Sequence, residues 1–164
     1  MNYMKKAASA ILITLFVVFI FPTTILAQPS ATKSNAAIIQ GAYGSFAKAD
    51  IPAVLSIMDP KVEWNEAENM IYGNNKPFIG PDAVVSEVFM KIGAEWDNFT
   101  LANLQVTNMD NNMVLATGRY QAKYKKNGAA LDAQFAHLWT FKDGKVIRFQ
   151  QYTDTKQFSE LIKK

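Results

Sequence analysis

The spacing of apolar residues changes once along this chain, and the change limits the folds it can adopt. Up to about residue 93 apolar residues recur at intervals of three and four, which is typical of amphipathic helices. From Trp96 onward they alternate with polar residues at every second position, which is typical of half-buried strands. Helices followed by a run of antiparallel hairpins predict an α+β domain, in which a curved sheet wraps over helices and leaves a concave face.

The first half predicts three helices separated by one short strand and a loop. Asp50 is placed to cap the second helix, Asp59-Pro60 to end it, and Gly93 to close the third. The predicted helices are 35–49, 51–58 and 82–93, the strand is 62–65, and the loop, rich in acid, amide and glycine, is 66–76.

The second half predicts long strands joined by tight turns, then a last helix. A phase slip at Ala102-Asn103 indicates a β-bulge, and Asp143-Gly144 accepts the positive φ angles of a hairpin turn. Asp154 precedes the last helix and is interpreted as its N-cap. The other predicted turns are 110–112 and 126–128, and the inward residues of the last helix are Phe158, Leu161 and Ile162.

The strand before the Asp143-Gly144 turn carries the only histidine of the chain, His137. Alternation places it on one face with Phe135, Trp139 and Phe141, which indicates the wall of a pocket. On the following strand, counting by twos puts Gln151 on the same inward face as Phe149 and Ile147. A small molecule is therefore the expected partner of the concave side.

Residues 1–27 differ from the rest of the chain. Lys5 and Lys6 precede an uncharged run, and Ala27 stands before a polar segment, which predicts a secretory signal peptide and a secreted or periplasmic protein. The alternative is an uncleaved membrane anchor, because residues 7–27 hold no charge. After leader removal we expect no stable membrane insertion, a flexible tail at 28–35 and one domain at 36–164.

Composition excludes several classes of function. The chain has no cysteine, so disulfides and a lipid-modified cysteine anchor are impossible, and with one histidine no zinc site of the usual nitrogen and sulfur kind is expected. The formal net charge of +3 falls to +1 without the two lysines of the leader, and this balance predicts no nucleic-acid partner. We also expect no cofactor.

Three segments resemble one family in order and spacing. They are FAKADIPAVLSIMDPKVEW, PFIGPDAVVSEVF and AHLWTFKDGKVIRFQQYTDT, and the resemblance spans about residues 36–160. The chain resembles the SnoaL-like, ketosteroid-isomerase-related branch of the nuclear transport factor 2-like superfamily. The resemblance implies a cone-shaped, curved antiparallel sheet packed on three N-terminal helices, with frequent dimers through the sheet. It implies functions from isomerases, polyketide cyclases and epoxide hydrolases to binding modules without catalysis.

The catalytic residues of the family are not retained. Compared with the steroid isomerases, Ala42 stands at the oxyanion-hole tyrosine, with Tyr43 next to it, Trp64 at the aspartate base and His137 at the protonated aspartic acid. Compared with the polyketide cyclases, His137 matches their histidine, but Gln151 replaces their aspartate. The resemblance therefore implies neither known mechanism.

The candidate acid–base groups are His137 together with Glu66 or Glu68 from the loop. An imidazole titrates near neutral pH, and a carboxyl that enters an aromatic cavity has a raised pKa. The alternatives are a neutral core histidine and solvated surface acids, and for Gln151 a purely structural amide. The candidate ligand-binding residues are Tyr43, Trp64, Tyr120, Phe135, Trp139 and Gln151.

Three functions are compatible with this sequence. The first is an exported domain that binds a small, mostly apolar molecule in the cone cavity. The second is a cofactor-free lyase, isomerase, cyclase or hydrolase, which requires a carboxylate within reach of His137 or of a shared substrate position. The third is a homodimeric interaction module that uses the outward face of the sheet at Arg148, Gln150 and Tyr152, and it requires a large exposed apolar patch there.

Overall fold

The computed structural model of the protein describes residues 33–163. The predicted leader, residues 1–27, lies outside these residues, and so does most of the predicted tail. The first helix begins at Asn35, and Ser34 caps it by accepting a hydrogen bond from the backbone N–H of Ala37 at 3.2 Å. The helices are α1 Asn35–Phe46, α2 Ile51–Leu55, α3 Pro81–Val84, α4 Met90–Glu95 and α5 Thr155–Lys163, with a π-helical turn, Val85–Phe89, between α3 and α4. The strands are β1 Met58–Asn65, β2 Phe78–Ile79, β3 Trp96–Met109, β4 Met113–Tyr124, β5 Ala130–Lys142 and β6 Lys145–Thr153.

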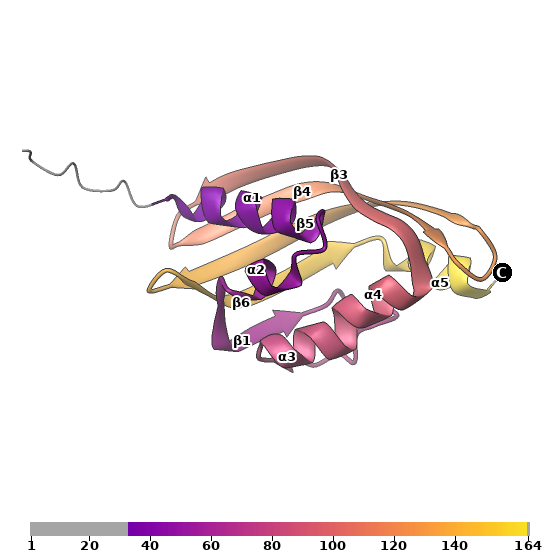
Figure 1. The fold of residues 1–164 in the computed structure, drawn as a ribbon, viewed down its shortest axis with the longest axis horizontal. Helices are drawn as coiled ribbons and strands as arrows, with labels where there is room; N and C mark the ends of the chain where they lie inside the picture. The colour runs from indigo at the N-terminus through magenta and orange to yellow at the C-terminus, as the bar shows by residue number, and fades with distance from the viewer. Residues whose placement is uncertain (1–32, 164) are drawn as a thin grey trace, which may run out of the picture. The chain divides into compact units, whose positions relative to one another are not determined.

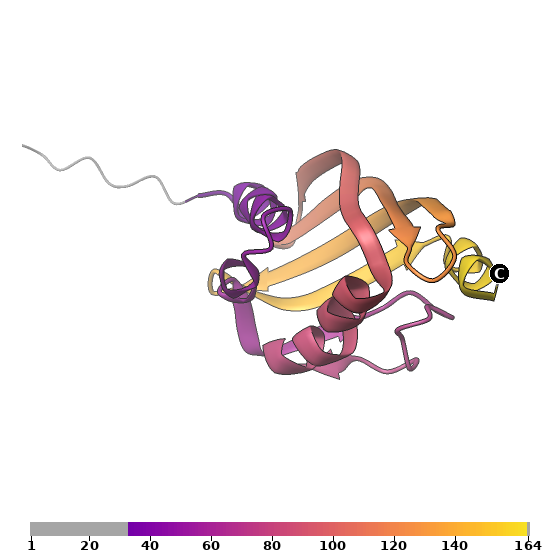
Figure 2. The same cartoon turned by 45° about the vertical axis from the view of Figure 1, so that its right-hand side comes forward.

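The strands form one curved sheet in the order β2-β1-β6-β5-β4-β3 (Figure 1). Long hairpins connect β3 to β4, β4 to β5 and β5 to β6, and the strong curvature of β3 and β4 is visible in Figure 2. This confirms the predicted α+β class. The sheet is not antiparallel throughout, however, because β1 pairs with β6 in parallel. The two strands are far apart in the sequence, so no hairpin forces them into opposite directions.

Helices α1, α2 and the continuous α3–α4 segment pack on the inward face of the sheet. Ile39, Val54 and Val88, one from each, belong to a single buried cluster with inward residues of the strands. The third helix runs past Gly93 to Glu95, so the predicted end was wrong. Gly93 lies in an ordinary helical turn, and the helix ends where the strand geometry of Trp96 begins. No helix within residues 33–163 is long and apolar enough to cross a membrane.

The hairpin-turn, bulge and N-cap signals of the sequence are confirmed. Asp143 and Gly144 have φ angles of 49° and 76° in the hairpin turn between β5 and β6. The β3–β4 register shifts between Ala102 and Gln105, where the bulge was predicted. Asp50 accepts a hydrogen bond from the backbone of Ala53, and Asp154 from that of Gln157, each at 3.2 Å.

Three local predictions were wrong. Asp59-Pro60 lies inside β1 rather than ending α2, because the helix already stops at Leu55 and β1 takes up the chain at Met58. Ile147 is only half-buried, because a register shift between Thr140 and Phe141 breaks the alternation and buries Val146 instead. Ile162 is 37% exposed, while Phe158 and Leu161 are buried as predicted.

Candidate ligand-binding site

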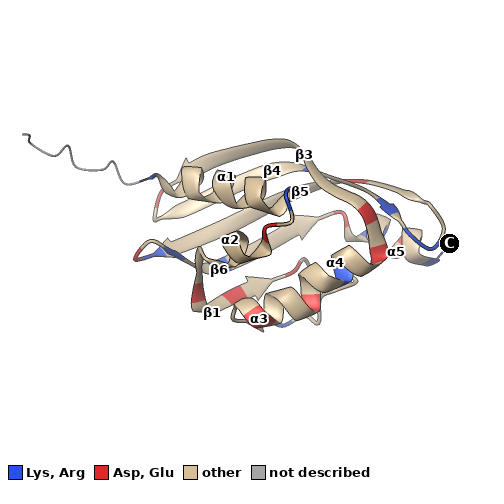
Figure 3. Ribbon diagram, in the orientation of Figure 1, with Lys and Arg blue, Asp and Glu red and all other residues tan. Residues whose placement is uncertain are grey.

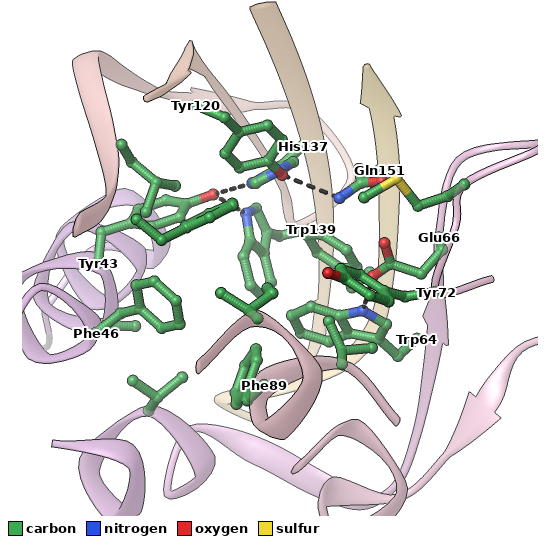
Figure 4. A pocket seen from close by; sticks show the side chains of 18 of the residues that line it. Tyr43, Phe46, Trp64, Glu66, Tyr72, Phe89, Tyr120, His137, Trp139 and Gln151 are labelled. Atoms are coloured by element: carbon green, nitrogen blue, oxygen red, sulfur yellow. Dashed lines mark hydrogen bonds between the residues drawn. The ribbon is translucent and has the colours of Figure 1, made fainter. Parts of the chain in front are cut away.

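A mostly apolar cavity of about 60 Å³ lies between the helices and the inward residues of β5 and β6 (Figure 4). That volume exceeds the roughly 10–15 Å³ that one water requires, so the cavity can hold a small group of non-hydrogen atoms. Its polar groups belong to only a few side chains, and the rest of the wall is aromatic or aliphatic. The aromatic and titratable residues of the wall are Tyr43, Phe46, Trp64, Glu66, Tyr72, Phe89, Phe99, Tyr120, His137, Trp139, Phe149 and Phe158.

His137 is buried in the wall and both of its ring nitrogens are occupied. It lies on β5 directly opposite Gln151 of β6, so both side chains point inward as the strand alternation predicts. Nδ1 lies 2.6 Å from the hydroxyl of Tyr43, and Nε2 contacts the hydroxyl of Tyr120. Phe135 stacks on the imidazole with ring centroids 4.3 Å apart. The ring is therefore fixed on both edges and on one face.

Each tyrosine hydroxyl also accepts a hydrogen bond from a further side chain. Trp139 Nε1 donates to the Tyr43 oxygen at 3.0 Å, and Gln151 Nε2 donates to the Tyr120 oxygen at 3.0 Å. The orientation of the Gln151 amide follows from the backbone N–H of Ala67, which donates to Oε1 at 3.2 Å. These residues form a hydrogen-bonded network in which every polar atom of His137 and Gln151 on the cavity side has a partner, as Figure 4 shows in part.

Burial determines the ionisation of this network. It lowers the pKa of His137 from 6.5 to about 3, because the charged imidazolium would lose its hydration. Burial likewise raises the pKa values of Tyr43 and Tyr120 above their ordinary value. At neutral pH His137 is therefore an uncharged ring that connects two neutral tyrosines, and it is poorly suited to accept a proton from a substrate.

Glu66 is the second titratable group of the cavity, and its environment differs. It follows β1 two residues after Trp64, so both side chains point inward, and Trp64 Nε1 donates to Glu66 Oε1 at 2.6 Å. The other oxygen, Oε2, is buried without a hydrogen-bond partner among the described residues. Burial raises the pKa of Glu66 from 4.5 to about 7, against the opposing effects of the hydrogen bond from Trp64 and of the nearby Gln151 amide.

The structure separates the two glutamates that the sequence proposed. Glu68 is exposed and does not line the cavity; it lies in a surface hollow with Asn69 and Lys76, which Glu66 also borders from its other side. The loop between β1 and β2 turns after Glu66, so residues past it leave the inward face. Of the proposed acid–base groups, the structure brings only Glu66 and His137 into one cavity.

The proposed ligand-binding residues lie at or next to this cavity. Tyr43, Trp64, Tyr120, Trp139 and Gln151 line it, whereas Phe135 packs behind His137 and Tyr120. Sequence reasoning missed several wall residues, among them two from the loop and two that it had assigned to helix cores. The signal for the former was an apolar stretch, Met-Ile-Tyr, inside an otherwise polar loop. These residues are Met70, Tyr72, Phe46 and Phe89.

The charges of the domain lie mostly away from the site. Figure 3 shows acidic and basic residues distributed over several elements, while the inner parts of β5 and β6 are largely uncharged. Within residues 33–163 no three histidine, cysteine or carboxylate side chains lie close enough together to hold a metal ion.

The fold and the aromatic cavity define a protein of the nuclear transport factor 2-like class, and comparison with known proteins agrees. A model of the SnoaL-like domain matches residues 39–149, and the chain belongs to this family. No curated protein matches the chain.

Solved structures of the same class cover most of the chain. An NTF2-like protein from Burkholderia thailandensis is 25% identical with a TM-score of 0.71, over 80% of this chain and 98% of that one. An NTF2-like protein of unknown function from Burkholderia pseudomallei is 23% identical with a TM-score of 0.72, over 81% and 100%. TerC, co-crystallised with polyporic acid, is 29% identical with a TM-score of 0.69, over 79% and 98%.

Proposed function

We propose that the chain binds a small, mostly apolar molecule in the cone cavity and that a polar group of this molecule contacts Glu66. One observation carries the proposal, namely that Glu66 Oε2 is buried in an aromatic cavity and has no hydrogen-bond partner within residues 33–163. Buried polar atoms are nearly always hydrogen-bonded, because an unpaired one costs about 1–3 kcal/mol. A bound molecule with a donor or acceptor at this position would satisfy the oxygen.

The walls of the cavity support the same class of ligand. Trp64 and Trp139 meet at 5.7 Å between ring centroids with their planes at 80°, so they present both a face and an edge to the space they enclose. Aromatic walls favour flat, apolar groups. The co-crystallisation of TerC with polyporic acid supports small-molecule binding as a function available to this class.

Tryptophan N–H signals in NMR spectra test this proposal directly. The chain has three tryptophans: Trp64 and Trp139 line the cavity, while Trp96 lies in a separate cluster and serves as an internal control. We expect acetophenone, added to the full chain, to shift the indole N–H signals of Trp64 and Trp139 saturably and to leave that of Trp96 unchanged. Absence of a saturable shift, or equal shifts at all three, would contradict the proposal.

Acid–base catalysis without a cofactor is a second candidate, as in an isomerase, cyclase or hydrolase. A specific observation favours it: the pKa of Glu66 is raised to about 7, where a carboxyl group can both give and accept a proton. In this candidate Glu66 is the base, and His137 orients the substrate through the tyrosines.

The test uses the exchange of the CH₂ protons of phenylacetone in D₂O, followed by NMR. We expect the wild-type chain to accelerate the exchange, Glu66→Gln to abolish the acceleration, and the surface variant Glu68→Gln to retain it. Exchange at the buffer rate, or exchange indifferent to Glu66→Gln, would remove this candidate.

Export and dimerisation are further parts of the proposal. The leader pattern in residues 1–27 supports export to the periplasm or the medium, which N-terminal sequencing of the exported protein would test. On the outward face of β6, Tyr152 is 56% exposed, and Arg148 on the same face is exposed too. Together with the dimers through the sheet that the family resemblance implies, this makes the outward face the proposed homodimer interface. Light scattering should then give twice the monomer mass, and Tyr152→Arg should reduce it to the monomer mass.

A further inference from the structure

Glu66 lies at the boundary between two spaces of different character. It lines the aromatic cavity, and it also borders a surface hollow of about 400 Å³ formed mainly by the loop between β1 and β2. Oε1 of Glu66 accepts a hydrogen bond from Trp64 Nε1 at 2.6 Å, whereas Oε2 is buried without a partner among the described residues. The unpaired oxygen is therefore a fixed acceptor where the apolar space adjoins the polar one.

No cation of the described domain neutralises Glu66. No salt bridge within residues 33–163 involves its carboxylate, and neither lysine nor arginine lines the cavity. The other titratable residues of the cavity wall are Tyr43, Tyr72, Tyr120 and His137. Burial raises the pKa values of the three tyrosines and lowers the pKa of His137 to about 3, so all four are neutral at pH 7. The only charge that the wall can carry at this pH is therefore negative.

The surface hollow offers further hydrogen-bond acceptors beside Glu66. Asn65 and Gln150 border it, and each donates an amide N–H to a backbone carbonyl of β6, at 3.1 and 3.0 Å. The oxygen of each amide lies on the other side of the group and can accept a hydrogen bond from a ligand. The other charged residues of the hollow are Glu68 and Lys76, which are both exposed and offset each other. The hollow therefore adds acceptors to the site without adding a net positive charge.

These surroundings select a ligand by its charge. An anion would be repelled by Glu66 and would find no basic side chain in the cavity. A neutral donor can bond to Oε2, but an ammonium group also balances the charge, and charge-assisted hydrogen bonds are about twice as strong as neutral ones. The faces of aromatic rings attract cations as well. Because the hollow is open to water, an ammonium group at the boundary keeps part of its hydration, which limits the cost of binding it.

We propose that the ligand is an amphiphilic amine, whose apolar part lies in the aromatic cavity and whose ammonium group donates a hydrogen bond to Glu66 Oε2 at the boundary with the hollow. The inference rests on the proposed function and specifies the polar group of its ligand. The remaining N–H bonds of the ammonium group face the hollow, where Asn65, Gln150 and water accept them. Recognition thus combines aromatic walls with one carboxylate that lacks a counter-ion in the protein.

Binding of a cation is linked to the proton of Glu66. The pKa of this carboxyl group is raised to about 7, so its attraction for an ammonium group is present at pH 8 and lost as the pH falls to 5. The tyrosines and His137 stay neutral over this range and do not add to the change. A bound ammonium group favours the ionised carboxylate in return and therefore lowers the pKa of Glu66.

Three probes of nearly the same shape isolate the charge of the ligand. Ethylbenzene, benzyl alcohol and benzylamine differ only in the terminal group, which is a methyl, a neutral hydroxyl or an ammonium group. Their affinities for the full chain at pH 8 are measured from the indole N–H signals of Trp64 and Trp139. We expect benzylamine to bind about tenfold more tightly than benzyl alcohol, and benzyl alcohol more tightly than ethylbenzene. Benzoate, an anion of similar size, should bind most weakly of all.

Two variants that remove the same charge test whether Glu66 is responsible. Glu66→Gln should abolish the preference for benzylamine over benzyl alcohol. Glu63→Gln, exposed on the opposite face of β1, should keep it. In the wild type the preference should disappear at pH 5, and benzylamine should lower the pKa of Glu66, followed by its carboxyl ¹³C shift, by about one unit.

The outcomes separate the amine from the proposed function. If benzylamine and benzyl alcohol bind equally, if benzoate binds most tightly, or if Glu66→Gln keeps the preference, the amine is overturned while small-molecule binding stands. Loss of the preference in Glu63→Gln as well would indicate general attraction to a negative surface and would also overturn the amine. If none of the probes binds, both proposals are overturned.

Discussion

His137 and Glu66 are two ionisable groups of the same cavity, and their surroundings give them opposite properties. Both nitrogens of His137 contact tyrosine hydroxyls, and burial lowers its pKa to about 3. Glu66 has one bonded oxygen and one unpaired oxygen, and burial raises its pKa to about 7. Burial disfavours the charged form of both groups. It therefore lowers the pKa of the imidazole, whose protonated form is charged, and raises the pKa of the carboxyl group, whose deprotonated form is charged.

The comparison shows which of the two groups is available for function. A residue type that titrates near neutral pH, such as histidine, becomes a fixed part of the wall when its polar atoms are satisfied and desolvated. A carboxyl group, which is normally ionised at neutral pH, becomes able to exchange a proton there. The chemistry of the cavity is therefore expected at Glu66, with His137 as the element that orients Tyr43 and Tyr120.

The largest expected effect is on the pH dependence of stability at Glu66. Its pKa is raised from 4.5 to about 7 in the folded state, so the unfolded chain loses its proton first as the pH rises. The free energy of unfolding therefore falls between pH 4.5 and 7, by about 3 kcal/mol in total. Glu66→Gln should remove this loss. The free energy of unfolding of the variant, relative to that of the wild type, should therefore rise by about 3 kcal/mol from pH 4 to pH 8.

Urea unfolding of the full chain at several pH values measures this difference. The exposed Glu68→Gln serves as the matched control and should show a flat difference across the range. A flat difference for Glu66→Gln as well would mean that Glu66 ionises as an ordinary surface acid.

The second effect concerns His137→Phe, and its dependence on pH is opposite, because the wild type loses stability here as the pH falls. At pH 8 this variant should be less stable than wild type by about 2 kcal/mol, because Tyr43 and Tyr120 each lose a buried hydrogen-bond partner. The pKa of His137 is lowered from 6.5 to about 3 in the folded state, so the wild type loses stability as the pH falls below 6.5. This loss reaches about 2 kcal/mol at pH 5. The variant and the wild type should therefore be about equally stable at pH 5. A stability difference that stays constant from pH 8 to pH 5 would contradict the lowered pKa of His137.

The smallest effect concerns the hydrogen bond between Trp64 and Glu66. Trp64→Phe removes the donor that stabilises the carboxylate, so the pKa of Glu66 should rise further, by about one unit. The carboxyl ¹³C shift of Glu66 followed against pH measures the change. Trp96→Phe, whose indole bonds to Tyr72 instead, should leave the pKa of Glu66 where it is.

The sequence predicted the features that depend on local periodicity. Strand alternation placed His137, Trp139 and Gln151 inward, and the hairpin turn was predicted at Asp143-Gly144. The pairing of His137 with Gln151 also depends on the register shift between Thr140 and Phe141, because the turn alone would place His137 opposite Gln150. Alternation along β1 also indicated Glu66, which continues the inward series of Val62 and Trp64 just past the end of the strand. Glu68 has the same parity, so alternation alone could not separate the two glutamates; the loop conformation after Glu66 does so.

The remaining features depend on contacts between distant residues. Tyr43 is 94 positions from His137 in the sequence, and no local pattern indicates that its hydroxyl meets Nδ1. Ile147 was placed on the wrong face because it is the extra residue of a β-bulge: Thr140 pairs with Arg148 and Phe141 with Val146, so the register shifts by one residue at Ile147. The parallel pairing of β1 with β6 likewise follows from the closure of the whole domain.

The most direct measurement is an NMR titration of the His137 ring and the Glu66 carboxyl in one sample from pH 4 to pH 9. We expect the imidazole to stay neutral over the whole range, consistent with its pKa of about 3, and the carboxyl to titrate near pH 7. An imidazole that titrates near 6.5 beside a carboxyl that titrates near 4.5 would contradict the assignment of the proton-exchanging role to Glu66.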